Sequence, residues 1–207
     1  MKNIFKAFLL SAIVAPMVIS CDDDNIIPLG DTQLPAYTPV KVAETFSKGA
    51  DNTLLNIAGW TNFNQTGTKK WMIQVYSGNG YAEFNPYGSN EAENVGWLVT
   101  PALDLNDAKD HTLTFRSSQS YVSSSSNKLE ILISKNYDGT NVAAATWTPL
   151  NATLPTTSST YFAFIESGKV NLSAFTGSTV HIAFKVTGSG TNTALDGAYQ
   201  IDNVIVQ

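Results

Sequence analysis

Aromatic and polar side chains occur together in residues 76–94, where tyrosines are interspersed with Asn, Glu and Ser. A flat aromatic ring packs against the apolar face of a pyranose, while amides and carboxylates form hydrogen bonds to sugar hydroxyl groups. We predict that this stretch, with the neighbouring loop at 120–127, forms a ligand-binding surface. Its candidate aromatic residues are Trp71, Tyr76, Tyr81, Tyr87 and Tyr121. The alternative for each is packing in the core or at its rim.

Groups for covalent or metal-assisted catalysis are scarce. The two histidines, His111 and His181, are 70 positions apart, and neither an H-E-x-x-H nor a G-x-S-x-G motif occurs. No cysteine follows Cys21, so a cysteine nucleophile is excluded from the rest of the chain. We therefore predict that the protein is not an enzyme.

Three carboxylates leave a hydrolase open as the less favoured alternative. Glu83, Glu91 and Glu93 lie among aromatic residues, and glycoside hydrolysis needs only two carboxyl groups. Their sequence spacing does not set the required separation, and surface charge is the simpler interpretation.

The single cysteine follows a short apolar segment. Lys2 and Lys6 precede the uncharged residues 8–20, a run too short to cross a bilayer as a helix and typical of a cleaved secretion signal. The sequence VISC at 18–21 matches the bacterial lipobox, which indicates that residues 1–20 are removed and that Cys21 is lipidated. An ordinary signal peptide with an incidental cysteine is the alternative.

The residues after Cys21 suggest a tether. Residues 21–39 contain three prolines and four aspartates and lack periodicity, which predicts an extended acidic linker. The run of three aspartates at 22–24 is similar to the export signal of surface lipoproteins in Bacteroidetes; in enteric bacteria it would resemble an inner-membrane retention signal. We predict a lipid-anchored protein of the bacterial outer membrane, exposed at the cell surface.

Charge argues against a nucleic-acid partner. Removal of residues 1–20 takes Lys2 and Lys6 from the 12 basic residues and leaves all 17 acidic ones, so the mature chain carries a net charge of −7. Such a chain, without a Lys/Arg cluster, is poorly suited to nucleic acid or to an anionic membrane surface.

Residues 40–207 have the pattern of one all-β domain. Residues 111–117, 128–134 and 179–186 alternate apolar and polar side chains, and Gly, Asn and Ser turns recur between such runs. No segment of a dozen residues has a helical period. We predict a single antiparallel β-sandwich of the jelly-roll type over residues 40–207.

Several short motifs, in order, resemble a known family. They are GWTNFNQTGTKKW (59–71), GWLVTPALDL (96–105), LTF (113–115), LEILIS (129–134), ATWTPL (145–150) and GAYQIDNVIV (197–206). Together they resemble the choice-of-anchor J and cleaved-adhesin domains of Bacteroidetes surface proteins, over about residues 43–207. The resemblance implies a jelly-roll sandwich like that of carbohydrate-binding modules, with Trp60, Trp97 and Trp147 in the core.

The same resemblance implies a structural calcium ion between the first and last strands. The matching positions are Glu44 and Asp202, and Asn203 stands where the family often has a second Asp. Calcium takes six to eight oxygen ligands from carboxylates, amides and carbonyls, so Glu44, Asp202 and Asn203 are the candidate ligands. Solvated carboxylates at sheet edges are the alternative.

These observations favour a non-catalytic, lipid-anchored adhesion or binding module that recognises a glycan. The alternative is an accessory or structural subunit of an outer-membrane complex that binds a protein partner. Coplanar aromatics in a groove would favour the glycan, and a large flat apolar patch would favour the protein partner.

Overall fold

The three runs of alternating residues all form strands. The computed structural model describes residues 40–107 and 109–207; the predicted signal segment 1–20, Cys21 and the tether 21–39 lie outside the described residues. The runs correspond to β8 (Thr112–Ser120), β9 (Lys128–Ser134) and β13 (Thr179–Gly188), as predicted.

Eight strands make up the first sheet. Their order is β11-β8-β14-β5-β4-β2, with β1 paired to β14 and β12 paired to β8. Besides β8, the strands are β1 (Val42–Glu44), β2 (Thr53–Leu54), β4 (Met72–Tyr76), β5 (Asn79–Phe84), β11 (Ile165–Glu166), β12 (Val170–Asn171) and β14 (Ala198–Val206). Every pairing is antiparallel, and the β8–β14 register shifts between Asp202 and Ile205.

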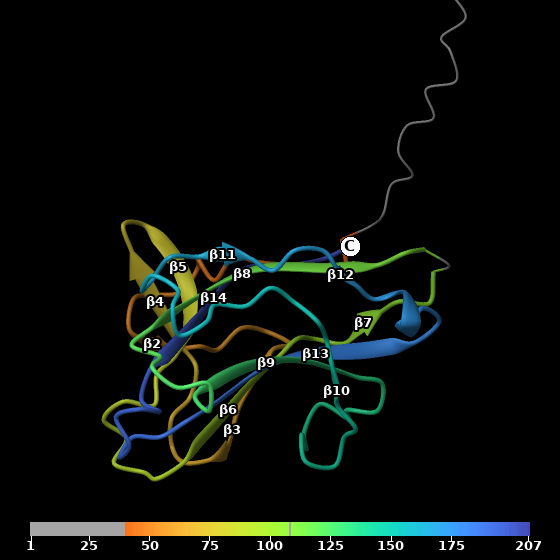
Figure 1. Cartoon of the computed structure of the whole chain (residues 1–207). Coiled ribbons are helices and arrows are strands. Elements are labelled where there is room, and N and C mark those ends of the chain that lie inside the picture. The colour runs from red at the N-terminus through yellow and green to blue at the C-terminus, as the bar shows by residue number, and fades with distance from the viewer. Residues whose placement is uncertain (1–39, 108) are drawn as a thin grey trace, which may run out of the picture. The chain divides into compact units, whose positions relative to one another are not determined.

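The second sheet has six strands and lies face to face with the first (Figure 1). Its order is β10-β9-β13-β6-β3, and β7 pairs with β13. Besides β9 and β13, the strands are β3 (Thr61–Thr66), β6 (Asn94–Val99), β7 (Leu103–Asp104) and β10 (Thr148–Pro149). The pairings are again antiparallel, so the predicted antiparallel sandwich is confirmed.

The main core fills the space between the sheets. Phe115 of β8 and Phe184 of β13 meet edge to face with ring centroids 5.2 Å apart. A Cβ atom at Gly96 would lie 1.9 Å from the ring of Phe84, so only glycine allows that close approach of β6. Burial of these large apolar side chains is the main stabilising contribution to the fold.

A second apolar cluster lies on the other face of the six-stranded sheet. The loop between β9 and β10, teal at the bottom of Figure 1, brings Tyr137 and Trp147 against Trp97, and the Trp97 and Trp147 rings are 5.2 Å apart. Trp60 instead packs against Phe46 of the main core. All three tryptophans that the resemblance placed in the core therefore pack against one of the two clusters.

Helix is nearly absent from the described residues. Residues 173–175 form one 3-10 turn, η1 (Ser173–Phe175). Within residues 40–107 and 109–207, no helix has the length and apolar character that crossing a bilayer would require.

Candidate functional site

One groove on the eight-stranded sheet collects most of the predicted aromatic residues. Alternation along β5 sends Ala82 and Phe84 into the core and Tyr81 and Glu83 to the opposite face. On the neighbouring strand β14, Gln200 lies opposite Glu83 and shares this outward face. Strand pairing therefore fixes the floor of the groove.

Two pockets make up this groove, which we call the aromatic groove. The Glu83 pocket has a volume of about 490 Å³, and the Tyr81 pocket a volume of about 520 Å³. The Glu83 pocket is lined by Glu83, Asn85, Tyr87, Ser120, Tyr121, Phe162, Asp196 and Ala198. The Tyr81 pocket is lined by Tyr76, Asn79, Tyr81, Phe162 and Phe164. Phe162 belongs to both pockets and joins them.

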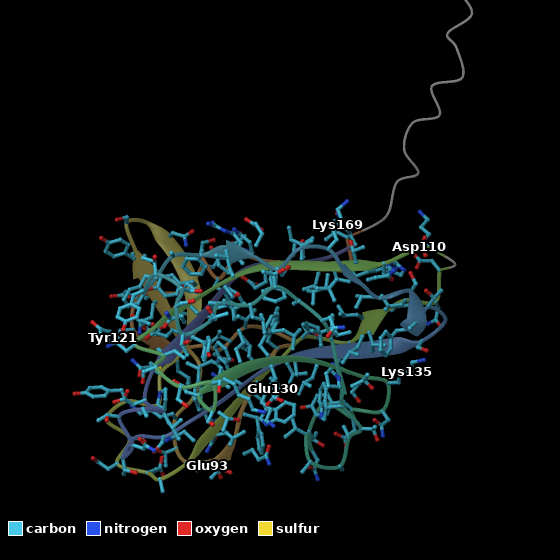
Figure 2. The ribbon with its side chains drawn as sticks, in the orientation of Figure 1. Glu93, Asp110, Tyr121, Glu130, Lys135 and Lys169 are labelled. Atoms are coloured by element: carbon cyan, nitrogen blue, oxygen red, sulfur yellow. The ribbon has the colours of Figure 1, made fainter. Side chains whose placement is uncertain are left out.

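Three separate segments supply the aromatic side chains. The β4–β5 hairpin and the turn after it provide Tyr76, Tyr81 and Tyr87, and Tyr121 follows the end of β8. Phe162 and Phe164 come from the segment before β11. Figure 2 shows Tyr121 at the end of the sandwich opposite Asp110 and Lys135.

A buried hydrogen-bond network supports the floor of the Glu83 pocket. Gln200 Nε2 donates to Glu83 Oε2 at 2.9 Å, and Ser118 Oγ donates to Gln200 Oε1 at 2.7 Å. Burial raises the pKa of Glu83, although hydrogen bonds from Gln200 and Asn85 act in the opposite direction. Burial, and then the charges of Glu83 and Asp51, raises the pKa of Tyr81. The pocket thus presents an oriented carboxylate beside aromatic rings.

Two aromatic residues of the groove have unfavourable backbone conformations. Tyr121 has φ of 60° and Phe162 has φ of 59°, the left-handed region that bulky residues rarely occupy. Their side chains are nevertheless 64% and 49% exposed, so core packing does not account for the choice of residue. Strained backbone conformations of this kind cluster at active sites and ligand-binding sites.

Gln119 holds the two strained segments in place. Its side chain is fully buried: Nε2 donates to the carbonyl of Ser159 at 2.6 Å, and Oε1 accepts from the amide of Val122 at 3.0 Å. Its carbonyl accepts from the amide of Phe162 at 2.8 Å. One residue of β8 therefore positions both sides of the Glu83 pocket.

Four of the five predicted aromatic residues line the groove, and one does not. Tyr76, Tyr81, Tyr87 and Tyr121 lie there, and the stretch 76–94 and the loop 120–127 meet at the Glu83 pocket. The prediction that Trp71 binds the ligand is wrong, because its side chain is 0% exposed and its ring centroid is 5.7 Å from that of Phe84. A buried ring cannot stack on a ligand, so Trp71 belongs to the core.

Sequence reasoning missed the segment 159–164. Tyr161 packs against Tyr121 with ring centroids 4.8 Å apart, and the ring of Phe164 is 5.6 Å from that of Tyr81. The signal available was the run YFAF at 161–164 in a stretch rich in Ser and Thr, without the length or alternation of a core strand.

The predicted calcium ligands lie on two paired strands, Glu44 on β1 and Asp202 and Asn203 on β14. Glu44 is in register with Val204, and Glu44 Oε1 accepts from the amide of Phe46 at 2.6 Å. Asp202 is fully buried, and its oxygens accept from Asn79 Nδ2 at 3.1 Å and from the amide of Asn203 at 2.7 Å.

The fit of these residues to calcium rests on Asp202. Both of its recorded donors are uncharged, and Arg116, opposite it on β8, forms its ion pair with Glu166. A buried carboxylate with neutral partners suits a cation. Within residues 40–107 and 109–207, however, no three His, Cys, Asp or Glu side chains are grouped closely enough to hold a metal by themselves. Calcium would therefore depend on amide and carbonyl oxygens as well.

Neither histidine belongs to the groove. His111 is buried and bonded to Asp107, and His181 Nδ1 lies 2.8 Å from the carbonyl of Thr100. Both are thus committed to structural contacts elsewhere.

A family model and solved structures match this chain. The model described as "Domain of unknown function (DUF5017)" matches residues 103–206. This region includes Gln119, Tyr121, Phe162 and Gln200, while the β4–β5 hairpin lies before it. No curated protein matches the sequence.

The similar structures include adhesin domains. The K1 cleaved adhesin domain of Lys-gingipain from Porphyromonas gingivalis has a TM-score of 0.50 and 18% identity, covering 82% of this chain and 98% of that domain. The K3 domain of the same protein has a TM-score of 0.51 and 17% identity, covering 82% and 99%. The CBM22-1 xylan-binding domain of Xyn10C from Paenibacillus barcinonensis has a TM-score of 0.47 and 13% identity, covering 82% and 94%. The likeness to the two adhesin domains shows a shared fold and agrees with the predicted jelly-roll sandwich.

Proposed function

The chain belongs to the DUF5017 family, and we propose that this member is a non-catalytic binding module that recognises a glycan in the aromatic groove. The observation that carries the proposal is the convergence of aromatic rings from three segments around Glu83, whose carboxylate is held in place by the buried Gln200. Rings offer flat apolar faces to a sugar, and the Glu83 carboxylate with the lining amides of Asn85 and Asn79 offers partners for its hydroxyl groups.

The distribution of exposed apolar side chains favours a glycan over a protein partner. Among the described residues, seven large hydrophobic side chains are exposed, and five lie in or beside the groove: Tyr76, Tyr87, Tyr121, Tyr161 and Phe162. The other two are Val40 and Leu54. Two scattered residues are normal for a protein surface and do not suggest a flat interface. The exposed apolar side chains are thus concentrated in the aromatic groove, where their rings can pack against a pyranose.

A glycan array with the full-length chain tests this function. We expect selective binding, which Phe162→Ala weakens about tenfold because the change removes the ring shared by both pockets. Leu54→Ala is the matched control, since Leu54 is exposed but does not line the groove. A blank array, or equal binding by the Phe162 and Leu54 variants, would refute the glycan proposal.

The proposal that the module is non-catalytic also has a direct test. Glu83 and Asp196 both line one pocket, and a glycosidase needs two carboxyl groups across the bond that it cleaves. Glu83 Oε2 is already engaged by Gln200. We expect glycans recovered after prolonged incubation with the protein to be intact by mass spectrometry, and shortened products would establish a hydrolase.

Display at the bacterial surface completes the proposal. The lipobox cysteine and the acidic residues after it support a lipid anchor at Cys21 in the outer membrane, with residues 21–39 as a spacer. In a bacterium that processes lipoproteins, the protein should partition into the detergent phase, and Cys21→Ser should move it to the aqueous phase. Aqueous partition of the unsubstituted protein would refute the anchor.

We also propose that calcium binds at Asp202, with Glu44 and Asn203 as further ligands. The buried carboxyl group of Asp202 supports this proposal, and the pairing of β1 with β14 places Glu44 opposite Val204, two residues beyond Asp202. The ion would add a link between the two ends of a domain that has no cysteine after residue 21.

A further inference from the structure

The two pockets of the aromatic groove differ in charge. The Tyr81 pocket is lined by aromatic rings and Asn79 and contains no carboxylate. The Glu83 pocket is lined by two carboxylates, those of Glu83 and Asp196, and by no Lys, Arg or His. One half of the groove is therefore apolar and neutral, and the other half is acidic.

The two carboxylates lack cationic partners inside the protein. Within residues 40–107 and 109–207, Asp107, Glu130 and Glu166 form ion pairs with Lys or Arg, whereas Glu83 and Asp196 form none. Arg116 packs over the ring of Phe164, which lines the Tyr81 pocket, and is paired with Glu166. The negative charge of the Glu83 pocket is thus left for a ligand to balance.

Aromatic rings share the pocket with these carboxylates. Tyr87, Tyr121 and Phe162 line the Glu83 pocket together with Glu83 and Asp196. Ammonium groups are attracted both to the faces of aromatic rings and to carboxylates, and a partly desolvated site strengthens both attractions. The same pocket repels a carboxylate or sulfate on a ligand. This combination selects for a positive charge.

From this charge complementarity we propose that the Glu83 pocket recognises the protonated amino group of an amino sugar. This inference rests on the proposed glycan function and specifies its ligand class. The glycan extends across Phe162, and its adjoining sugar unit stacks on the aromatic rings of the Tyr81 pocket. Sugars bearing a carboxylate are excluded from the Glu83 pocket.

Matched monosaccharides test the inference without assuming a linkage. D-glucosamine, D-glucose and D-glucuronate share one ring, and each sugar with an altered group differs from glucose at a single position. Binding to the full-length chain is followed by NMR titration. We expect glucosamine to bind about tenfold more tightly than glucose, because a charge-assisted hydrogen bond replaces a neutral one, and glucuronate not to bind. Higher salt should weaken glucosamine binding and leave glucose binding unchanged.

Variants identify the pocket responsible. Glu83→Gln and Asp196→Asn should each reduce the preference for glucosamine over glucose, while Glu93→Gln, an equal change of charge at an exposed residue outside both pockets, should retain it. The melting temperature of each variant shows whether it folds. Figure 2 labels Glu93 at the lower edge of the view.

The outcomes separate this inference from the function on which it rests. Equal affinity for glucosamine and glucose, or binding on the array only to glycans without a free amine, would refute the amino-sugar inference and leave glycan binding standing. Failure of all three sugars together with a blank array would refute both. A glucosamine preference that persists in the Glu83 and Asp196 variants would also refute the assignment to this pocket.

Discussion

At the scale of single residues, the conformation of Tyr121 gives a test of whether its side chain serves stability or binding. A left-handed backbone costs a bulky residue about 1–2 kcal/mol, while glycine loses about 0.5–1 kcal/mol through its greater freedom in the unfolded chain. At φ of 60° the first effect is the larger, so Tyr121→Gly should be at least as stable as Tyr121→Ala. Chemical denaturation measures this difference, and both variants should lose glycan affinity.

Tyr76 provides a control in which the stability difference between the Gly and Ala variants should be reversed. It is 76% exposed, ends β4 and does not have a positive φ. Glycine in a strand is destabilising, so Tyr76→Gly should be less stable than Tyr76→Ala. If Tyr121→Gly were also the less stable of its pair, the argument from strain would be wrong.

Glu83 predicts a dependence of stability on pH. Because burial raises its pKa, the folded state holds the carboxyl proton more tightly than the unfolded state does. The resulting stabilisation is complete below the unfolded pKa of about 4.3 and is lost as the pH rises through the folded pKa. Glu83→Gln should therefore melt at a higher temperature than the unsubstituted protein at pH 7, and the difference should vanish below about pH 4.

Thermal melts across this pH range check the prediction. Glu93→Gln, at an exposed position, should show no such difference at either end of the range. A lower melting temperature for Glu83→Gln at pH 7 would mean that the carboxylate is more important to the fold than its burial suggests. The expected result would mean that a stabilising substitution weakens binding, as is common at functional sites.

Some of the residues in the groove could be predicted from the sequence, and others could not. Tyr76, Tyr81, Tyr87 and Tyr121 were identifiable because aromatic residues in a polar stretch with turns tend to lie at a surface. Trp71 has a similar local sequence, and only the packing of its ring beside Phe84 shows that it is buried. The pairing of Glu83 with Gln200 joins residues 117 positions apart, so no local pattern indicates it.

At the scale of elements, Gln119 predicts a local change without loss of the fold. Gln119→Ala removes the bonds to the Ser159 carbonyl and the Val122 amide, at a cost of about 1–3 kcal/mol for each buried group left unpaired. Amide exchange by mass spectrometry should become faster in residues 156–163 and remain slow in β9 and β13. Glycan affinity should fall as well. Unchanged exchange in residues 156–163 would show that Gln119 does not position this segment.

The elements themselves were predictable to different degrees. Strands β8, β9 and β13 follow from alternation because each has one face in the core. The two-residue strands β10, β11 and β12 are too short to show a period. They hold the long connection between β9 and β13 against the sheets. The polar face expected for residues 179–186 is partly covered, since Tyr137 packs edge to face on His181 with ring centroids 5.1 Å apart. Loops that fold back over a sheet are set by tertiary packing and not by local sequence.

At the scale of the whole molecule, the calcium proposal concerns how the two ends of the domain are held together. Strand β1 pairs with β14 over three residues, and the amide of Lys41 donates to the carbonyl of Val206 at 2.7 Å. The Lys41 ammonium also donates to Asp107 at 3.0 Å and, as the largest cause, lowers the pKa of that carboxyl. Such a short pairing holds β1 only weakly. The buried Asp202 lies on β14, the strand to which β1 is paired.

A bound ion should therefore raise the stability of the entire domain. We expect a higher melting temperature with calcium than with a chelator, because a ligand that binds only the folded state stabilises it by mass action. Asp202→Asn should abolish this difference, while Asp138→Asn, an equal change of charge in an exposed turn, should preserve it. Thermal melts of the three proteins under both conditions make the measurement. Equal midpoints for the unsubstituted protein with calcium and with chelator would exclude the ion and leave Asp202 with its hydrogen bonds from Asn79 and from the Asn203 amide.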